Sequence, residues 1–420
     1  MWVINFKRGH IGYNSLFLNL SNHLFMNYKF LVALLAITVL FSNCKSTHGL
    51  VSLNVKNSLS FKRTEVVSVP NTVLFPLLQK YPAKDIRIKQ RQSGNVVPLQ
   101  WVDNNRNGIA DDELLFLADI KATETATYII FTDSTLPLPK VNGETYCRFV
   151  PERSDDFAWE NDKVAFRVYG QKGQQEARAG IAGSTLSSGV DLWLKKVPYP
   201  IIDKWYAGHV KEPGYYHKDR GEGYDPYHVG ASRGTGGTGV WVKDSLMVSD
   251  NFSGYRIIAT GPLRTIFELD YYPWSNYVVH ETKRISLDSG SNFSKFEVSL
   301  TADIEVPNFA FGISLLNNKG AARLENTTGW FRHWEAIDDS FVGEGIVVNP
   351  QFVTDAFANS SKSPDQSNLI VLSKPVKYLT YYAGFAWQKS GQVNGVSDWD
   401  ALLEKQSQII AHPLEVAAKK

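Results

Sequence analysis

The sequence has very little sulfur. Its 420 residues include only 2 cysteines, Cys44 and Cys147, and 3 methionines. Two cysteines cannot build the disulfide framework of a small secreted domain. An excess of charge of one sign is also lacking, because 44 basic residues face 42 acidic ones. So balanced a chain is not typical of nucleic-acid-binding proteins, and we expect no nucleic-acid partner.

Two widespread motifs are missing as well. The chain has no Walker loop for nucleotide phosphates and no H-E-x-x-H pair for zinc. The glycine-rich run 232–237 lacks the Lys-Ser/Thr pair that completes a phosphate-binding loop. The chain therefore offers no motif for nucleotide hydrolysis or zinc-protease chemistry.

The first 44 residues contain three basic residues and no acidic one. Residues 26–44 read MNYKFLVALLAITVLFSNC, which is a charged start, a short apolar run and a terminal cysteine. This order is typical of bacterial lipoprotein signals, so we interpret 1–44 as a signal segment that starts at Met26 or Met1. Cys44 is the expected lipidation site. The alternatives are an ordinary secretory signal or a membrane helix.

Removal of that segment leaves 41 basic and 42 acidic residues. We expect a periplasmic protein that meets the outer or inner membrane through its lipid anchor only, with the outer membrane preferred. If Cys44 carries the lipid, Cys147 has no partner, which favours a buried free thiol.

The rest of the chain indicates an all-β fold. It is rich in aromatic residues, with 11 Trp, 19 Tyr and 23 Phe, and it has 31 glycines. Alternating apolar and polar residues predict many short strands, among them 50–56, 64–69, 84–90, 125–132, 164–169, 190–197, 263–270, 277–287, 293–300 and 379–387. We expect a small β-domain over 48–138, a linker at 133–144 and a large antiparallel sandwich over 145–412. The pattern predicts one helix, 398–411.

Oxygen-bearing side chains are regularly spaced in the turn 103–113. The candidate ligands of a hard cation are Asp103, Asn105, Asn107, Asp111 and Glu113. A calcium-binding loop of the EF-hand type needs a glutamate at its twelfth position, where this chain has Leu114. The two interpretations are a structural calcium site and a solvated Asx/Gly turn. We expect no cofactor to be required for catalysis.

Residues 203–239 break the strand pattern and are rich in glycine, ionisable and aromatic residues. Such a long loop is usually functional or disordered, and its aromatic residues disfavour disorder. It contains His209, His217 and His228. Three interpretations stay open: a zinc site, ordinary surface residues, or an acid/base pocket in which arginine holds a carboxylate and tyrosines face sugar rings.

Four segments resemble one protein family: 151–170 (PERSDDFAWENDKVAFRVYG), 197–206 (VPYPIIDKWY), 215–237 (YYHKDRGEGYDPYHVGASRGTGG) and 281–292 (ETKRISLDSGSN). The family was first described as a domain of unknown function. It is encoded in polysaccharide-utilisation loci of Gram-negative bacteria and includes an ulvan oligosaccharide dehydratase. The resemblance covers roughly residues 50–400 of the chain, including the aspartate- and asparagine-rich turn.

This resemblance implies a small N-terminal β-domain followed by a large galactose-mutarotase-like antiparallel β-supersandwich. It also implies uronic-acid oligosaccharides of the ulvan type as partners. The implied reaction removes water across C4–C5 of a saturated uronate at the non-reducing end. The 4,5-unsaturated product is the form that downstream glycuronyl hydrolases accept.

That chemistry needs a cation at the carboxylate, a base for the C5 proton and an acid for the leaving hydroxyl. We assign Arg233 to the carboxylate, His217 to one proton transfer and Tyr227 to the other, with Asp219 orienting His217. The expected substrate-binding residues are Lys204, Tyr216, Lys218 and His228, with Tyr216 as the reserve for the second proton transfer.

Three other functions satisfy parts of the same pattern. They are a polysaccharide lyase of the same fold, a mutarotase or epimerase, and a non-catalytic glycan-binding lipoprotein. Outside the loop, we expect a structural ion pair between Glu281 and Lys283 and a core position for Trp387.

Overall fold

The computed structural model describes residues 50–419 of the chain. The predictions for residues 1–44, including lipidation of Cys44, lie outside the described residues. Within 50–419, no helix combines the length and the apolar character that a membrane crossing requires. Lipidation and periplasmic location therefore stay predictions.

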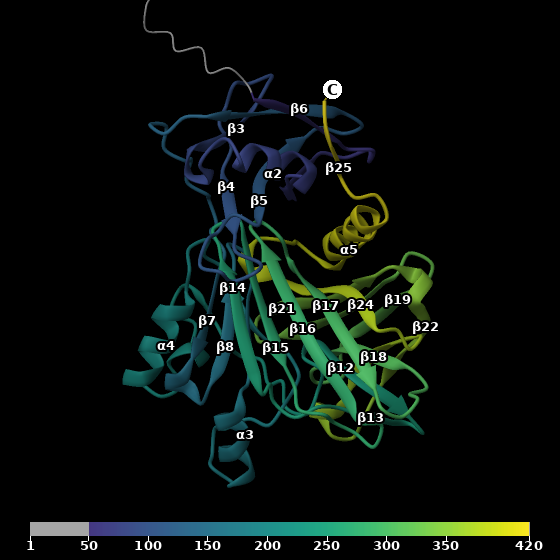
Figure 1. Ribbon diagram of the computed structural model, residues 1–420. Coiled ribbons are helices and arrows are strands. Elements are labelled where there is room, and N and C mark those ends of the chain that lie inside the picture. The colour runs from purple at the N-terminus through teal and green to yellow at the C-terminus, as the bar shows by residue number, and fades with distance from the viewer. Residues whose placement is uncertain (1–49, 420) are drawn as a thin grey trace, which may run out of the picture. The chain divides into compact units, whose positions relative to one another are not determined.

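The N-terminal part consists of two small antiparallel sheets and one helix (Figure 1). The first sheet has the order β25 (Glu415–Ala418), β1 (Val51–Lys56), β6 (Thr125–Thr132) and β3 (Ile86–Gln90). The second has the order β2 (Arg63–Ser68), β5 (Glu113–Ile120) and β4 (Leu99–Val102), with α2 (Asn71–Leu78) beside it. Because β25 pairs with β1, the last strand of the chain completes a domain that the sequence pattern ended at residue 138.

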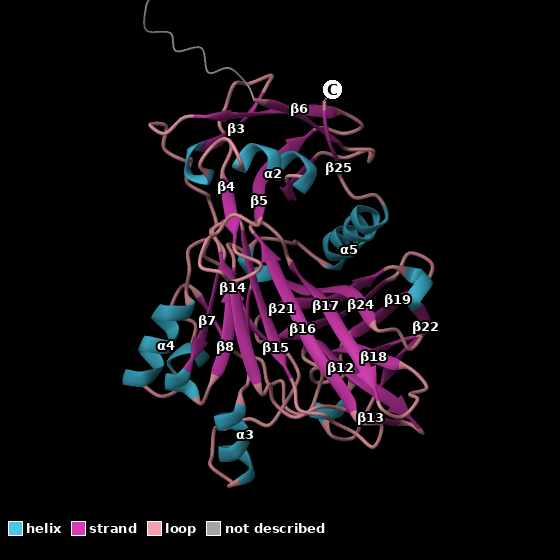
Figure 2. Cartoon of the chain, viewed as in Figure 1, coloured by secondary structure: helices cyan, strands magenta, loops and turns pink. Residues whose placement is uncertain are grey.

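The larger part is a sandwich of antiparallel sheets (Figure 2). One layer is an eight-stranded sheet with the order β14 (Gly254–Thr260), β15 (Arg264–Asp270), β16 (Val279–Asp288), β17 (Phe293–Ala302), β24 (Tyr378–Trp387), β21 (Ser340–Val348), β20 (Trp330–Ile337) and β19 (Ala321–Glu325). Its inner face packs against two five-stranded sheets in one aromatic-rich core. The predicted fold, a small β-part followed by a large antiparallel sandwich, is confirmed.

The two five-stranded sheets meet at a parallel bridge between Val190 and Gly234. One sheet has the order β13 (Ser245–Met247), β12 (Thr235–Val242), β18 (Phe309–Ser314), β23 (Asn368–Ser373) and β22 (Val353–Asn359). The other has the order β11 (Gly223–Tyr224), β10 (Asp191–Lys195), β9 (Ala165–Val168), β8 (Asp156–Glu160) and β7 (Tyr146–Val150).

Three further helices lie outside the sheets: α3 (Gln171–Arg178), α4 (Ile202–Lys211) and α5 (Val396–Ala411). The sequence pattern predicted α5 but none of the helices α2, α3 and α4. The expectation that 203–239 has little regular structure is wrong, since this segment contains most of α4, β11 and the start of β12. The buried stripe of α4 is Ile202, Trp205 and Tyr206, and a stripe of only three residues gives a weak helical period.

Strands β8, β9 and β10 alternate between two different faces. Their inner side chains enter the sandwich core: Phe157, Trp159, Phe166, Val168, Leu192 and Leu194. Their outer side chains include five charged residues: Asp156, Glu160, Arg167, Asp191 and Lys195. All five are buried, because the outer face is packed against the layer of aromatic residues from α4 and the turn that follows it.

Candidate active site

A buried arginine organises the outer face of β8–β10. Arg167 lies opposite Asp191 in the β9–β10 register, and its Nε donates to Asp191 Oδ2 at 2.5 Å. Its Nη2 donates to Asp225 Oδ2 at 2.8 Å and its Nη1 to the Tyr216 hydroxyl at 3.1 Å. Burial lowers the pKa of Arg167, but Tyr169, Asp191 and Asp225 outweigh it and raise that pKa well above its usual range. The guanidinium is therefore a permanent positive charge beneath the surface.

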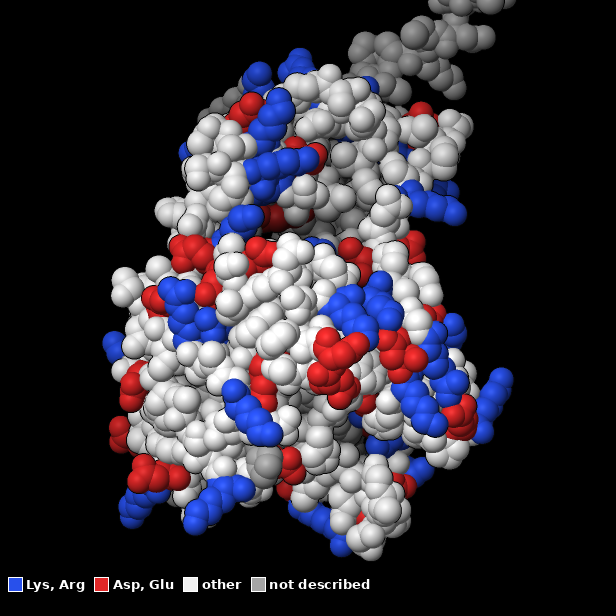
Figure 3. All heavy atoms as spheres, turned by 180° about the vertical axis from the view of Figure 1, so that it is seen from behind, with Lys and Arg blue, Asp and Glu red and all other residues white. Residues whose placement is uncertain are grey.

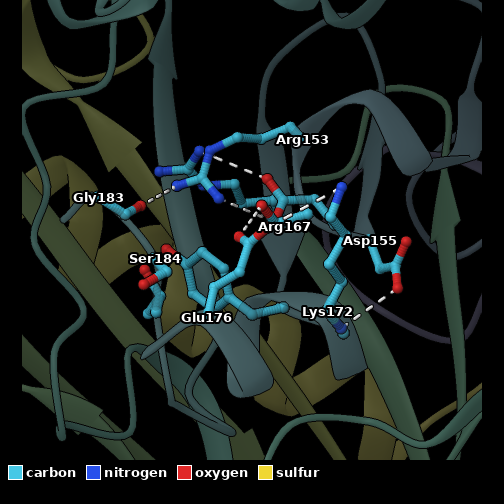
Figure 4. Close-up of polar contacts among 12 residues, drawn as sticks. Arg153, Asp155, Arg167, Lys172, Glu176, Gly183 and Ser184 are labelled. Atoms are coloured by element: carbon cyan, nitrogen blue, oxygen red, sulfur yellow. Dashed lines mark hydrogen bonds and ion pairs between the residues drawn. The ribbon is translucent and has the colours of Figure 1, made fainter. Parts of the chain in front are cut away.

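A second arginine extends this cluster toward solvent. Arg153 Nη1 lies 3.8 Å from Asp156 Oδ1, and Nη2 donates to the Gly183 carbonyl at 2.7 Å (Figure 4). Its side chain is 14% exposed, whereas that of Asp156 is fully buried. Burial raises the pKa of Asp156 to about 6, although Arg167 and Arg153 oppose this shift. Arg153 is thus the cation of the cluster with a surface toward solvent.

Aromatic side chains cover the charged cluster on the outer face of β8–β10. The Tyr206 hydroxyl donates to Asp156 Oδ2 at 3.0 Å, and the Tyr169 hydroxyl donates to Asp191 Oδ2 at 2.8 Å. Trp193 stacks on Tyr216 with ring centroids 5.0 Å apart. These rings exclude water, which strengthens the electrostatic interactions beneath them.

His217 connects the buried cluster with the protein surface, since it contacts Asp225 and is half-exposed. Gly214 adopts φ +81°, a conformation that suits glycine, and the short 3₁₀ helix η3 (Tyr215–His217) follows it. This turn places the Tyr216 ring inside the layer and the neighbouring imidazole outside, with 49% of the His217 side chain exposed. His217 Nδ1 lies 2.8 Å from the Asp225 carbonyl oxygen and 3.4 Å from Asp225 Oδ2.

The hydrogen-bond partners fix the tautomer of two imidazoles. A carbonyl oxygen can only accept, so His217 Nδ1 carries hydrogen and the neutral ring presents a lone pair at Nε2. His209 has the opposite arrangement, because its Nδ1 accepts the Gly214 amide at 3.0 Å, which leaves hydrogen on Nε2. Both rings contact Tyr216, with centroids 4.5 Å away for His209 and 4.7 Å for His217. One proton acceptor and one proton donor therefore flank the same tyrosine.

Neighbouring charges set the protonation of these groups. Burial and the positive charges of Arg153 and Arg167 lower the pKa of His209, which favours its neutral ring. Burial and Asp191 raise the pKa of Asp225 well above its usual range, despite Arg167. Such shifted groups beside a half-exposed histidine are typical of active sites.

Helix α4 is anchored to the same sheet by a second buried ion pair. Lys195 Nζ donates to Glu160 Oε2 at 2.6 Å, and both side chains are fully buried. Glu160 also accepts the backbone amides of Ile201 and Ile202 at the start of α4. A carboxylate at this helix N-terminus is favourable and fixes the helix that carries His209.

The predicted partner of His217 is wrong. Asp219 accepts Lys196 Nζ at 2.7 Å and the amides of Gly221 and Gly223, and no contact joins it to His217 in the described structure. Burial raises the pKa of Asp219, but Lys196 and these amides outweigh it, and the net shift is downward. Asp225 occupies the place beside His217 that was predicted for Asp219.

Arg233 does not join this group. It is 1% exposed, and its donors reach Ser188 Oγ at 3.0 Å and the Thr238 carbonyl at 3.1 Å. Burial lowers the pKa of Arg233 to about 10, although Glu281 opposes this. So enclosed a guanidinium cannot clamp a substrate carboxylate without a rearrangement of the core, which corrects the role predicted for it.

Tyr227 also lies in the interior, 5% exposed, with its hydroxyl 3.4 Å from Glu344 Oε2. Burial and Glu344 raise the pKa of Tyr227 well above its usual range. Glu344 accepts the Thr235 hydroxyl at 2.9 Å. The prediction that Tyr227 transfers a proton to a sugar is therefore also wrong, because its hydroxyl is buried.

The predicted substrate-binding residues separate into different surroundings. Tyr216 belongs to the Arg167 cluster. Lys204 pairs with Glu222 at 2.7 Å, and Lys218 lies 3.7 Å from Glu212. His228 is exposed and lies 3.3 Å from Asp365. The described structure thus brings Tyr216 and His217 together and places Lys204, Lys218 and His228 in surface ion pairs.

The turn with the candidate calcium ligands forms a network of its own. Asp103 accepts the amides of Asn107 and Gly108, Asn105 accepts that of Asn107, and Asn107 accepts that of Ile109. Asn104 donates to Glu113, and among residues 50–419 the Asp111 side chain has no hydrogen-bond or ion-pair partner. Among residues 50–419, no cluster of three or more His, Cys, Asp or Glu side chains is arranged to hold a metal ion. Calcium binding here stays a prediction.

Two glycine patterns in the chain are structural. Residues 230–234 spell G-x-S-x-G, but Ser232 is fully buried and donates to the Val229 carbonyl at 2.6 Å. Residues 234–239 spell G-x-G-x-x-G, but they lie at and within β12 rather than between a strand and a helix. Neither segment has the context that its pattern requires.

Three expectations outside the loop are met. Glu281 and Lys283 form a buried pair at 3.5 Å on β16. Trp387 is 1% exposed in the core, and Cys147 is a buried free thiol whose pKa burial raises to about 12. Basic and acidic side chains intermingle on the face seen in Figure 3, in line with the balanced composition.

Most residues of the cluster were not predicted from the sequence. Arg153, Asp156 and Arg167 lie in the first segment that resembles the family, and Asp191 lies in a predicted strand. The available signal was charge on the outer positions of strands whose inner positions are entirely apolar. These charged positions form a buried cluster only because α4 and η3 cover them, and the sequence pattern predicted neither element.

Comparison with known proteins places this chain. It is 38% identical over 403 residues to "Uncharacterized protein P7" of Formosa agariphila, which covers 93% of this chain and all of the relative. Two solved Enterococcus faecalis structures, a glycosyl hydrolase family 38 protein and an alpha-mannosidase, align with TM-scores of 0.45 and 0.42 at 10% and 8% identity. These alignments cover 93% of this chain, which spans about half the length of either solved chain. The model of the family described as "Domain of unknown function (DUF4861)" matches residues 55–416, and the chain belongs to that family.

Proposed function

We propose that the protein is a carbon–oxygen lyase that dehydrates acidic oligosaccharides. It removes water across C4–C5 of a saturated uronate at the non-reducing end of an ulvan-type chain. The observation that carries this proposal is the half-exposed His217, whose Nδ1 faces Asp225 and whose Nε2 has no hydrogen-bond partner among the described residues. A buried ion cluster that holds one imidazole at the surface is typical of acid–base catalysis.

The proposed reaction breaks the C5–H and C4–O bonds and forms a C4=C5 double bond. His217 Nε2 takes the C5 proton, which is acidic only when the neighbouring carboxylate is neutralised. Arg153, the arginine of the cluster with a surface toward solvent, neutralises that carboxylate. His209 Nε2–H donates a hydrogen bond to the departing 4-hydroxyl, and the proton that His217 took from C5 passes to that oxygen, which leaves as water.

In this proposal Asp225 and Tyr216 are positioning residues. Asp225 holds His217 in the tautomer that exposes a lone pair, and Tyr216 supports both imidazole rings. Arg167 fixes both groups from below. The site therefore contains a base, a hydrogen-bond donor and a cation on elements that are packed against one sheet.

Product analysis tests the reaction type. Purified uronyl-rhamnose oligosaccharides are incubated with wild type, His217→Gln and His228→Gln, and the products are followed by mass spectrometry and near-ultraviolet absorbance. We expect loss of one water at unchanged chain length, new absorbance from the conjugated double bond, and neither with His217→Gln. His228→Gln, an exposed histidine of the same segment, should react like wild type.

Other products would contradict the proposal in distinct ways. Shorter fragments with new absorbance would identify a polysaccharide lyase, and fragments that gain water would identify a hydrolase. A change of stereochemistry without absorbance would indicate an epimerase. Binding without any chemical change would identify a glycan-binding protein.

A further inference from the structure

A cleft lies on the outer face of the eight-stranded sheet. Its volume is about 880 Å³, and its lining comes from β16, β17, β24, helix α5 and the segment 61–68 that contains β2. A cleft of this size between a small domain and a larger one is typical of ligand sites. The lining contains no histidine and shares no residue with the Arg167 cluster, so it is a separate feature of the molecule.

The lining carries an excess of positive charge. It includes six basic side chains and two acidic ones: Lys62, Arg63, Lys163, Arg264, Lys295 and Lys405 against Glu65 and Asp288. Arg264 and Arg63 pair with the two acidic residues, and Lys62 and Lys295 pair with Asp119 and Glu297 outside the lining.

Two lysines are left without a carboxylate partner. Among the described residues, neither Lys163 nor Lys405 has an oxygen of Asp or Glu within 4.0 Å. Burial lowers the pKa of Lys163, with Asp162 opposing this, and Lys405 Nζ lies 5.9 Å from the centre of the Phe61 ring. An ammonium group in a partly enclosed cleft gains most from an anionic ligand.

The cleft also offers groups that suit a sugar ring. Tyr382 lines it, and burial together with Asp288 raises the pKa of its hydroxyl to about 12, so it stays a hydrogen-bond donor. Phe61 presents a partly exposed aromatic face, and Ser289 and Thr380 add hydroxyl groups. Aromatic faces beside hydroxyl donors and acceptors fit polyhydroxylated ligands better than lipid chains.

We propose that this cleft is a second binding site, which holds an acidic oligosaccharide through Lys163 and Lys405. Carboxylate or sulfate groups of the chain contact the two ammonium groups, and Tyr382 donates to a ring hydroxyl. The positive charge of the lining indicates that the ligand is an anion. Its identification as an acidic sugar chain rests on the proposed function. The site would retain long acidic chains and leave the chemistry at His217 unchanged.

Calorimetry tests this site in the full chain. His217→Gln serves as the parent, so that no turnover disturbs the signal, and the probe is a uronyl-rhamnose tetrasaccharide. We expect two binding events in the parent and, after Lys163→Gln/Lys405→Gln, weakening of one event by roughly tenfold or more. The affected event should also weaken with salt. The matched control is Lys362→Gln/Lys377→Gln, which removes two exposed lysines outside the cleft and should change neither event.

Three results would overturn the second site. They are a single binding event that the cleft variant leaves unchanged, equal binding of neutral cellotetraose, and binding of anionic lipid vesicles through these lysines without binding of the tetrasaccharide. The inference is separable from the proposed function. In an otherwise wild-type chain the cleft variant should turn over a uronyl-rhamnose disaccharide at the wild-type rate, and cleft binding can be measured even if no dehydration occurs.

Discussion

The buried side chains around Arg167 and those around Arg233 differ in their access to solvent. Arg167 and Arg233 are 4% and 1% exposed. The Arg167 cluster continues through Asp225 to a half-exposed imidazole. The Arg233 cluster is enclosed by side chains that are buried themselves: Tyr271, Lys283, Glu281 and Tyr381. Burial of charge is common to both, so access to the surface is what distinguishes a candidate site from a charged core.

The two clusters also differ in their balance of charge. Three aspartates surround Arg153 and Arg167, whereas Arg233 and Lys283 share one carboxylate, that of Glu281. Accordingly the pKa of Arg167 is raised well above its usual range, and that of Arg233 is lowered to about 10 by burial. The Arg167 cluster has more carboxylates than it needs to balance its arginines, and one of them, Asp225, can bind a proton beside His217. The Arg233 cluster has no such additional carboxylate.

The largest effect is expected from Arg167→Met. It leaves Asp156, Asp191 and Asp225 without their shared cation, and breaking a buried ion pair typically costs about 3–5 kcal/mol of unfolding free energy. Urea denaturation measures the change. Arg178→Met is the control, because that exposed pair with Asp250 should contribute less than about 1 kcal/mol. Equal losses in both variants would show that the Arg167 cluster is not the structural centre of the site.

A smaller effect separates Asp225 from Asp219. Asp225→Asn replaces the carboxyl group 3.4 Å from His217 Nδ1 and keeps the backbone carbonyl, and we expect kcat/KM to fall roughly ten- to hundredfold with a changed pH profile. Asp219→Asn keeps an oxygen for the amides of Gly221 and Gly223 and should retain the wild-type rate and profile. The reverse result would restore Asp219 as the partner of His217.

Stability should also depend on pH through Glu344. Burial raises its pKa from 4.5 to about 8, so between these values the folded state holds a proton that the unfolded state has lost. Ionisation of Glu344 therefore lowers the free energy of unfolding as pH rises from about 4.5 to about 8, and this loss levels off above pH 8. Glu344→Gln should reduce this decline by an amount on the order of 1–3 kcal/mol, measured by urea denaturation across that range. The exposed Glu297→Gln should leave the slope unchanged.

The smallest effect concerns the turn 103–113, an exposed group of oxygens in contrast to the buried clusters. If it binds calcium, addition of millimolar Ca²⁺ should raise Tm by a few degrees, about 1–4 °C, and Asp103→Ala should abolish that rise. Magnesium at the same concentration is the control. An unchanged Tm would identify the turn as solvated.

Local pattern was sufficient for much of the fold. The alternation in 125–132 and 293–300 predicted β6 and β17 closely, and the 398–411 pattern predicted α5. It did not show that β25 returns to pair with β1, because that contact joins the two ends of the described chain. It also missed α4, whose stability comes from packing on Trp193 and from Glu160 at its first turn rather than from helical periodicity.

The candidate site was predictable only in part. The segment 203–239 does contain His217, Tyr216 and Asp225, but sequence proximity could not show which side chains point inward. Arg233 lies 16 residues after His217 in the sequence, yet it enters the core through β12 and its neighbours. Arg167 is distant in sequence and reaches Asp225 because β9 and β10 bring it beneath the η3 turn.

The most direct test compares His217→Gln with Arg233→Met. Initial rates of dehydration are measured on one uronyl-rhamnose oligosaccharide and divided by the folded fraction of each variant. We expect His217→Gln to lose on the order of 10²–10⁴-fold while it stays folded. Arg233→Met should be less stable but keep its rate per folded molecule within about threefold of wild type. An active His217→Gln, or a folded Arg233→Met without activity, would contradict the assignment of the chemistry to the Arg167–His217 cluster.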